Sequence, residues 1–309
     1  MASIYQGFGA TLGHSEESTF GTAVSRTNWR PLISSNLLRT IERVPRPNLI
    51  TGAVGAMRRA HYTASDQAGG ALSVEMTYEN CGMLLKHLMG ASATAGTTHT
   101  YTLGTLPTGL TIENVRGSGT SEVFEGCRIN TGTLAVASAG VMTLDLDIIA
   151  ETSAARGAAG SATYGSGDTP ILHSHAGQFS FDSANYDLVD LSITVNNALA
   201  RRQLLGSAVT KQPKRSDFQS VEVSITVEVD DHLYAELLSG QTGDAQITFT
   251  SGSLECAISM QNCYMTSVSD PVTGAGIVQQ SVVFSAESDG TDEGLSIQIT
   301  NGKSGATDN

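Results

Sequence analysis

The sequence predicts a mainly β protein with two tandem β-sandwich or partial-barrel domains, each carrying one short flanking α-helix, plus long loops. The first observation is an internal repeat, because residues 127–151 and 263–287 share residue types at a constant offset of 136 positions (263 − 127 = 287 − 151). The second is that each copy follows an alternating strand and a short amphipathic helix that ends at Gly90 or Gly240. A duplicated β unit without an evident catalytic motif favours assembly over chemistry.

The composition fits a protein with extensive protein–protein contacts. A chain of 309 residues has room for about two domains. Charged residues make up 15% of the chain, against roughly 25% in typical domains, and interface cores are depleted in charge. A β protein with many turns is the alternative explanation. The formal net charge of −13 excludes a conventional DNA-binding surface, since such a surface needs Lys and Arg to displace counterions.

Neither a metal site nor a membrane segment is predicted. The four cysteines show no C-x-x-C and no zinc spacing, so we expect no metal and no cofactor. The first residues lack the basic and apolar regions of a secretory signal. No apolar run approaches the ~18 residues of a membrane span. We therefore expect a soluble protein that is made in a cytoplasm and has no membrane contact.

The first half is predicted as an arm followed by a domain. We assign residues 1–30 to an N-terminal arm and residues 31–153 to the first domain, with a long excursion around residues 39–67 that has little sustained period. Residues 71–78 alternate between apolar and polar side chains, which predicts a half-buried strand. Asn80 is the expected N-cap of the helix that ends at Gly90. The side chains predicted to pack this helix on its sheet are Met83, Leu84 and Leu88.

The second half repeats this order. Residues 154–170 are rich in Ala, Gly and Ser and predict a linker. Residues 171–300 form the second predicted domain, with an alternating strand over residues 221–229 and a helix that ends at Gly240. So short a helix is marginal alone and must pack on its sheet. Its predicted packing face is Leu233, Tyr234, Leu237 and Leu238. Residues 301–309 are expected to be a loose tail.

Candidate catalytic motifs are weak. Residues 302–304 read Gly-Lys-Ser, like the end of a phosphate-binding loop, but position 297 is Ile and no helix is expected to follow. His173 and His175 could present two imidazoles on one side of a strand, but no Asp or Glu sits at useful spacing, which favours a solvated loop. Strand carboxylates could serve as general acids only inside a cleft. The sequence therefore predicts no catalytic residues and no enzyme.

Several stretches together resemble the tail tube (major tail) proteins of long-tailed bacteriophages, two-domain type. They cover most of the chain and comprise residues 13–22, 71–90, 126–151, 196–206, 221–240 and 247–250. The linker and the helix at Cys81 do not match. The resemblance implies that copies form a ring whose inner wall is a continuous β-barrel around a channel, and that rings stack head to tail. With two tube domains per chain, three copies would give a pseudo-sixfold ring.

The resemblance also implies partners and a location. The chain would assemble with itself, surround the tape-measure protein and viral DNA, and meet a tail terminator and distal tail or baseplate proteins at the ends. It would belong to the virion tail and be assembled in the host cytoplasm. Its function would be a structural channel for passage of genomic DNA into the host.

Two sets of residues are candidates for these roles. A lining of Glu, Asp, Ser and Thr would let DNA pass, whereas Lys and Arg would hold it. The lumen candidates are the polar strand residues Ser73, Glu75, Thr77, Glu222, Ser224, Thr226 and Glu228. The candidates for ring stacking and subunit contacts are the basic residues of two excursions, Arg39, Arg43, Arg58, Arg59, Arg201, Arg202, Lys211, Lys214 and Arg215. A solvated basic face is the alternative for the second set.

Three other functions stay open. An extracellular β-sandwich adhesin or surface-layer module would also be rich in strands and small polar residues, but such proteins usually carry disulfides. A virion decoration or baseplate protein would not polymerise alone. A β-sandwich hydrolase would carry a pocket with a perturbed carboxylate pair.

Overall fold

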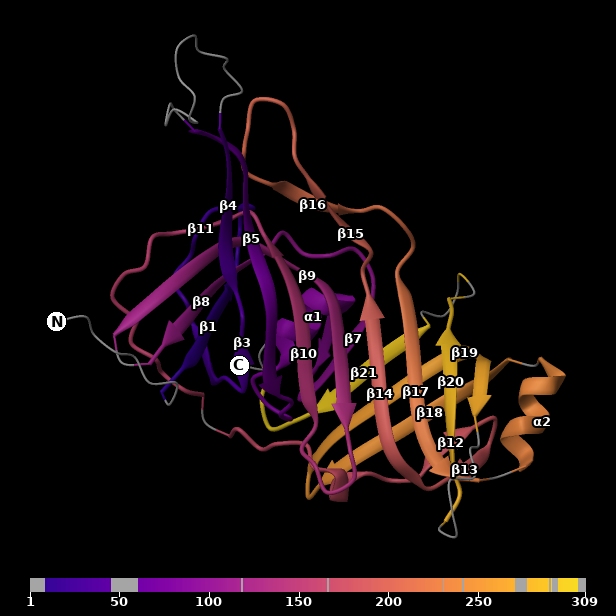
Figure 1. The fold of residues 1–309 in the computed structure, drawn as a ribbon. Helices are drawn as coiled ribbons and strands as arrows, with labels where there is room; N and C mark the ends of the chain where they lie inside the picture. Colours follow the sequence, from indigo (N-terminus) through magenta and orange to yellow (C-terminus); the bar gives the residue numbers. More distant parts are fainter. Residues whose placement is uncertain are drawn as a thin grey trace.

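The chain forms two stacked β layers that share long strands, with one short helix between the layers and another at one edge (Figure 1). It is mainly β, as predicted. The computed structural model describes residues 9–45, 61–117, 119–165, 167–229, 231–240, 242–269, 277–288, 290 and 294–304.

The front layer runs continuously through both halves of the chain. Its hydrogen-bonded order is β4–β5–β10–β9–β14–β17–β20–β19, and all neighbours are antiparallel. The short strand β3 (Ser34–Ser35) extends β4 along β5. The other strands are β4 (Leu38–Pro45), β5 (His61–Glu75), β10 (Thr143–Ala150), β9 (Thr120–Val136), β14 (Leu188–Asn196), β17 (Ser220–Glu228), β20 (Gln279–Ala286) and β19 (Leu254–Ser269).

The back layer has two parts, the first built by the first half of the chain and the second built by strands of both halves. The first part is β2–β1–β8–β9–β11, and the second is β13–β12–β18–β19–β21–β7–β6. These strands are β1 (Thr11–Glu16), β2 (Asn28–Pro31), β6 (Gly90–Ala95), β7 (Thr98–Leu103), β8 (Leu110–Arg116), β11 (Thr152–Ser153), β12 (Phe179–Phe181), β13 (Ala184–Tyr186), β18 (Thr242–Ser251) and β21 (Leu295–Thr300).

The long strands β9 and β19 cross from the back layer to the front at equivalent points. The residue before each repeated cysteine is left-handed, with φ 62° at Gly126 and 51° at Asn262. The pairing register with β8 and β18 shifts at the same places, which is a β-bulge that bends the strand. The two positions are 136 residues apart (262 − 126), so the sequence repeat marks equivalent places in the fold.

The two halves share a strand order but are joined in one sheet. Each half contributes four strands to the front layer, and the last of the four is the long crossing strand, β9 or β19. The halves are connected by the pairing of β9 with β14 and of β7 with β21. The predicted domain limits, residues 31–153 and 171–300, therefore stay a prediction.

The two helices are packed differently. α1 (Gly82–Met89) buries Met83, Leu84 and Leu88 and ends at Gly90, as the sequence predicts. The predicted cap Asn80 is wrong by one residue. Cys81 holds the N-cap position, and its side chain forms no capping hydrogen bond with the helix. Asn80 is left-handed with φ 66° and donates to Asp168 instead.

α2 (Asp231–Ser239) lies at the edge of the layers, beside β19 (Figure 1). Leu233 is buried and Leu237 partly buried against the core. Tyr234 is 50% exposed and Leu238 71% exposed, so the predicted packing face is wrong for these two residues. An edge helix touches the sheet with one side only, whereas α1 is enclosed between layers.

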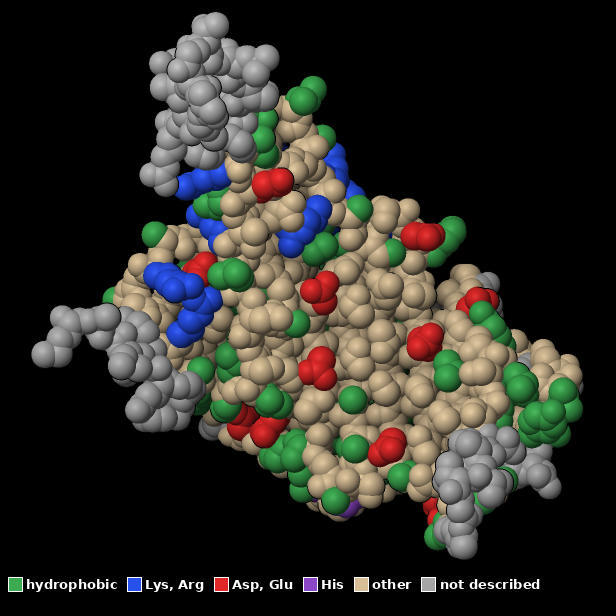
Figure 2. All heavy atoms as spheres, in the orientation of Figure 1, with side chains coloured by type: hydrophobic (Ala, Val, Ile, Leu, Met, Phe, Trp, Pro, Cys, Tyr) green, Lys and Arg blue, Asp and Glu red, His purple; other side chains and the backbone are tan. Residues whose placement is uncertain are grey.

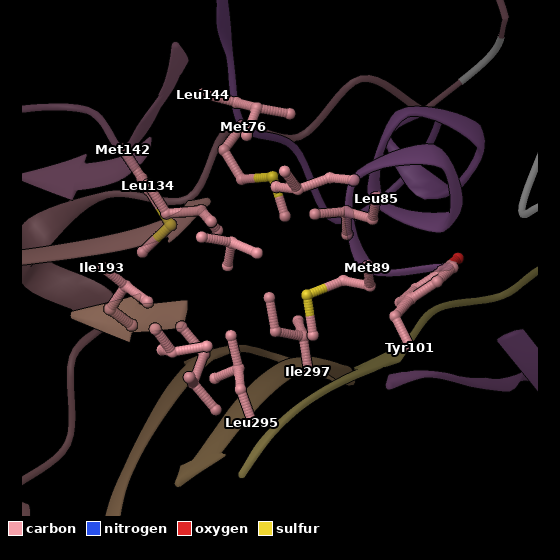
Figure 3. Close-up of a cluster of buried hydrophobic side chains, with 14 of the residues drawn as sticks. Met76, Leu85, Met89, Tyr101, Leu134, Met142, Leu144, Ile193, Leu295 and Ile297 are labelled. Carbon is pink, nitrogen blue, oxygen red and sulfur yellow. The ribbon is translucent and has the colours of Figure 1, made fainter. Parts of the chain in front are cut away.

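The core spans the junction between the halves. Figure 3 shows Leu85 and Met89 of α1 facing Leu134 of β9 and Ile193 of β14, with Leu295 and Ile297 of β21 beneath them. All of these side chains are buried. A cooperative unit that includes both halves follows from this shared core.

Segments predicted as arm, linker and tail are held against the layers. The arm supplies β1 and all but the last residue of β2, and β1 pairs with β8. In the linker, the Gly160 amide donates to Glu113 at 2.8 Å, and a short 3-10 helix (His173–His175) follows at residue 173. In the tail, Asn301 donates to the Tyr78 carbonyl at 2.9 Å. These hydrogen bonds and strand pairings join residues that are distant in the sequence. They therefore produce no periodic pattern in the local sequence.

Two buried histidines predict acid sensitivity. Burial lowers the pKa of His14 and of His87 to about 3, against ~6.5 in an unfolded chain. The folded state therefore binds fewer protons than the unfolded state between these values, so stability falls as the pH drops below 6.5. The expected loss is about 2 kcal/mol per histidine between pH 6.5 and 5.

The test compares denaturant unfolding of His14→Leu and of the parent chain across that pH range. The variant should lose less stability than the parent, because one of the two titrations is gone. His173→Leu, which replaces an exposed histidine, should keep the parent slope. Equal slopes for all three proteins would show that His14 does not titrate on unfolding.

Candidate functional site

The exposed side of the front sheet is one polar surface built by both halves. The strand register places Ser73 opposite Asp145 and Asp145 opposite Thr133. It continues with Thr133 opposite Thr194 and Thr194 opposite Glu222. Because residues directly opposite each other point to the same side of a sheet, these five form a single row across the junction.

We call this surface the acidic face. It carries six carboxylates, Glu75, Asp145, Asp147, Asp190, Glu222 and Glu228. Ser and Thr dominate the positions between them. The strand segments that build it, residues 71–75, 131–135, 143–147, 190–196, 220–228 and 279–285, are all described and contain no Lys or Arg. Figure 2 shows scattered Asp and Glu over these strands, with Lys and Arg gathered elsewhere.

Strict alternation fixes which side chains reach this surface. In β10, Leu144 and Leu146 are buried while Asp145 and Asp147 are exposed. Successive side chains of a strand point to opposite faces, so the apolar residues fill the core and the polar ones meet solvent. The Thr133 and Thr194 hydroxyls lie 3.1 Å apart and link the two halves on the acidic face.

The structure brings together most of the predicted lumen candidates. Those on the acidic face are Ser73, Glu75, Glu222, Ser224, Thr226 and Glu228. Thr77 is not among them, because it is only 3% exposed. β5 ends at Glu75 and the chain turns inward, so the Thr77 hydroxyl bonds to the Glu79 carbonyl and lies beside Arg30.

Sequence reasoning missed three carboxylates of this face, although their signal was present. Asp145 and Asp147 alternate with leucines in β10, as Glu222 does with valines in β17. Asp190 precedes the alternating part of β14 and accepts a hydrogen bond from the Ser138 amide at 3.2 Å.

Two hairpins project beyond the layers at one end of the molecule (Figure 1). The first is β4–β5, and the second is β15 (Leu199–Arg202) with β16 (Lys211–Arg215). They lie side by side, since the Asp66 amide donates to the Ala208 carbonyl at 2.8 Å and Gln203 donates to the Ala64 carbonyl at 3.0 Å. The two hairpins therefore form one protruding unit.

The basic candidates divide into free and engaged residues. Arg43, Arg202, Lys211 and Lys214 are exposed on the hairpins, and their side chains form no hydrogen bond or ion pair with another described residue. Arg39 instead forms a two-point ion pair with Asp66, whose pKa it lowers, and also donates to the Ser153 carbonyl. Arg201 donates to the Ala68 carbonyl at 2.9 Å and Arg215 to the Gly104 carbonyl at 2.8 Å. Arg58 and Arg59 lie outside the described residues.

The second hairpin also presents apolar side chains to solvent. Leu205 at its tip is fully exposed, and Leu204 is half exposed. Phe218, just after β16, is 91% exposed. Large apolar side chains beside exposed cations are typical of a surface that meets another protein.

Among the described residues, these surfaces carry no arrangement typical of a catalytic or metal site. Glu75, Glu222 and Glu228 lie on an open sheet, and none of them lines a described cavity. Within the described residues, no three His, Cys, Asp or Glu side chains gather as metal ligands would. In the same part of the chain, neither helix has the length and apolar character to cross a membrane.

Comparison with known proteins identifies the family. A family model described as phage tail tube protein matches residues 7–286, nearly the whole chain. A search of curated proteins finds no match. The match covers both helices, the acidic face and every strand of the two layers except β21. The chain therefore belongs to the phage tail tube protein family and is a structural component of the virion tail.

Proposed function

We propose that copies of this chain close into rings whose inner wall is the front sheet, with the acidic face toward a channel that passes genomic DNA. The observation that carries this proposal is the continuity of a cation-free, acidic sheet surface across both halves of the chain. DNA is a dense polyanion, held by cationic surfaces through counterion release. An acidic and hydroxyl-rich wall would not hold it.

The outer edges of the front sheet support ring closure. Among the described residues, β4 pairs only with β5, and residues 267–269 of β19 pair only with β20. Open edges are competent to pair and are normally covered. Joining the β19 edge of one copy to the β4 edge of the next is a heterologous contact that closes into a ring.

The repeat sets the number of copies. If each half occupies one of six equivalent places, three chains complete a ring, and its wall has 24 strands (3 × 8). Rings would then stack through the protruding hairpins at one end, whose exposed side chains include Arg43, Arg202, Leu204 and Leu205. Stacking in one direction does not close, so a tube follows.

The remaining partners and location follow from this role. The channel would hold the tape-measure protein before DNA, and a tail terminator and distal tail or baseplate proteins would cap the ends. Assembly would take place in the host cytoplasm. The chain would need no cofactor and perform no catalysis.

Negative-stain electron microscopy of the purified, untagged protein over a concentration series tests the proposal. Hollow tubes or stacked rings with threefold or pseudo-sixfold end views are expected. Particles without a channel would contradict it. So would monomers at every concentration that also fail to add to fragments of isolated tails used as seeds.

A further inference from the structure

We propose that the exposed apolar side of α2, formed by Tyr234 and Leu238, is a lateral docking surface for the N-terminal half of a second copy. The contact would reproduce the junction between the two halves of one chain. This inference rests on the proposed ring, and it assigns the ring contact to named residues.

Helix α1 supplies the internal equivalent of this surface. Leu84 and Tyr234 each stand six positions before the closing glycine (90 − 84 = 240 − 234), and Leu88 and Leu238 each stand two before it (90 − 88 = 240 − 238). Leu84 and Leu88 are fully buried. Tyr234 and Leu238 are 50% and 71% exposed. The same helical positions are therefore covered in one half and open in the other.

The cover of α1 comes in part from the second half of the chain. Asn197, just after β14, is fully buried and donates to the Leu88 carbonyl at 2.9 Å and to the Ile129 carbonyl at 3.0 Å. Ile193 and Leu295 enter the same cluster as α1 (Figure 3). α1 also packs against β6 and β7 of its own half. α2 is followed directly by β18, without equivalents of these two strands, and no further half lies beside it, so its outer side is open.

The sheet edges next to the helices show the same difference, because the edge is paired in the first half and open in the second. In β9, residues 131–136 pair with β14. The equivalent stretch of β19 begins at residue 267 (131 + 136), and its matching edge is unpaired through Ser269 among the described residues. A register shift at Asn130 in β9 recurs at Thr266 in β19, 136 residues later (266 − 130). The two strands therefore present the same edge in the same register.

In the first half, β3 and β4 hold the place that β14 holds in the second half, and they form the outer edge of the front sheet. Ala150 and Ala286 are equivalent in the repeat (286 − 150 = 136), and they pair with Ala68 and Val221 respectively. The strand partners of those two residues are Arg39 and Val195.

This equivalence sets a register between copies. Thr131 lies opposite Asn196 at the internal junction. The equivalent pair is Ser267 of one copy opposite Thr40 of the next, since Thr40 follows Arg39 as Asn196 follows Val195. Directly opposed strand residues have Cβ atoms about 4.5–5.5 Å apart, close to the separation that a disulfide bridges.

The first experiment removes the apolar surface. Tyr234→Ser with Leu238→Ser should leave monomer unfolding unchanged, because both side chains are largely in solvent, and should abolish rings and tubes in sedimentation and electron microscopy. Tyr164→Ser is the matched control, since Tyr164 is also 50% exposed but lies far along the chain from α2. It should assemble as the parent does.

The second experiment reads the register directly. The native cysteines are all free and buried, so Ser267→Cys and Thr40→Cys in one chain introduce the two accessible thiols. Oxidation of assembled protein should link copies into covalent dimers and closed trimers, and neither single substitution should do so. A Leu238→Cys variant that links to itself would indicate a symmetric helix pair and overturn the proposal.

The outcomes separate this contact from the proposed function. Normal tubes from the Tyr234→Ser, Leu238→Ser variant, with no link between residues 267 and 40, would overturn the docking surface and leave the tube standing. A parent chain that forms neither rings nor tubes would overturn both.

Discussion

Replacing Asp145, Asp147 and Glu222 with lysine is expected to leave tube assembly intact and to slow DNA passage at least about tenfold at low salt. All three side chains lie on the acidic face and are exposed. Each replacement adds two charge units, so the formal charge of a copy changes from −13 to −7 (−13 + 3 × 2). The channel wall would then carry cations that displace counterions from DNA and hold it.

The measurement is the DNA ejection half-time of virions whose tails carry the variant, at about 50 and about 200 mM salt, a range over which cation–DNA affinity falls steeply. The delay should shrink as salt rises. The neutral variant, Asp145→Asn, Asp147→Asn and Glu222→Gln, should eject at nearly the parent rate, because removing acid does not create a DNA-binding surface. A lysine variant that ejects normally at low salt would show that this face does not line the channel.

Asn197→Ala is expected to destabilise the whole chain by about 2–4 kcal/mol, since each buried polar group left without its partner costs roughly 1–3 kcal/mol. The Asn197 side chain is fully buried. Its amide donates to the Leu88 and Ile129 carbonyls, and its oxygen accepts from Arg215 and Gln219. The substitution therefore opens a polar void where α1, β9 and β14 meet.

Asn196→Ala is the matched control. Asn196 is exposed and its side chain accepts one local hydrogen bond from the Ala198 amide, so a loss below about 1 kcal/mol is expected. Urea unfolding of monomeric protein measures both variants. Equal losses would mean that the buried Asn197 does not tie the halves together.

Alternation made much of the acidic face predictable. Ser73 and Glu75 in one half and Glu222 to Glu228 in the other follow a strict two-residue period that the structure keeps. The period does not mark where a strand ends, so it does not show that Thr77 lies beyond the end of β5 and is buried. It also cannot show that β9 and β14 pair and carry the two stretches on one surface.

Repeat spacing predicted equivalent positions but not their surroundings. The offset of 136 residues pointed to Cys127 and Cys263, and the bulges at Gly126 and Asn262 keep that offset. The helical period of α2 marked Tyr234 and Leu238 as apolar without indicating what covers them. Residues 11–31 and 154–170 pair with distant strands, as β1 does with β8, and such contacts have no local sequence signal.

A reconstruction of the assembled tube by electron cryo-microscopy tests the central claim most directly. We expect the channel wall to consist of the front sheet, with Asp145 and Glu222 pointing toward the axis and β19 of each copy paired with β4 of the next. A tube whose channel is lined by the back layer, with the acidic face on its outer surface, would contradict the account.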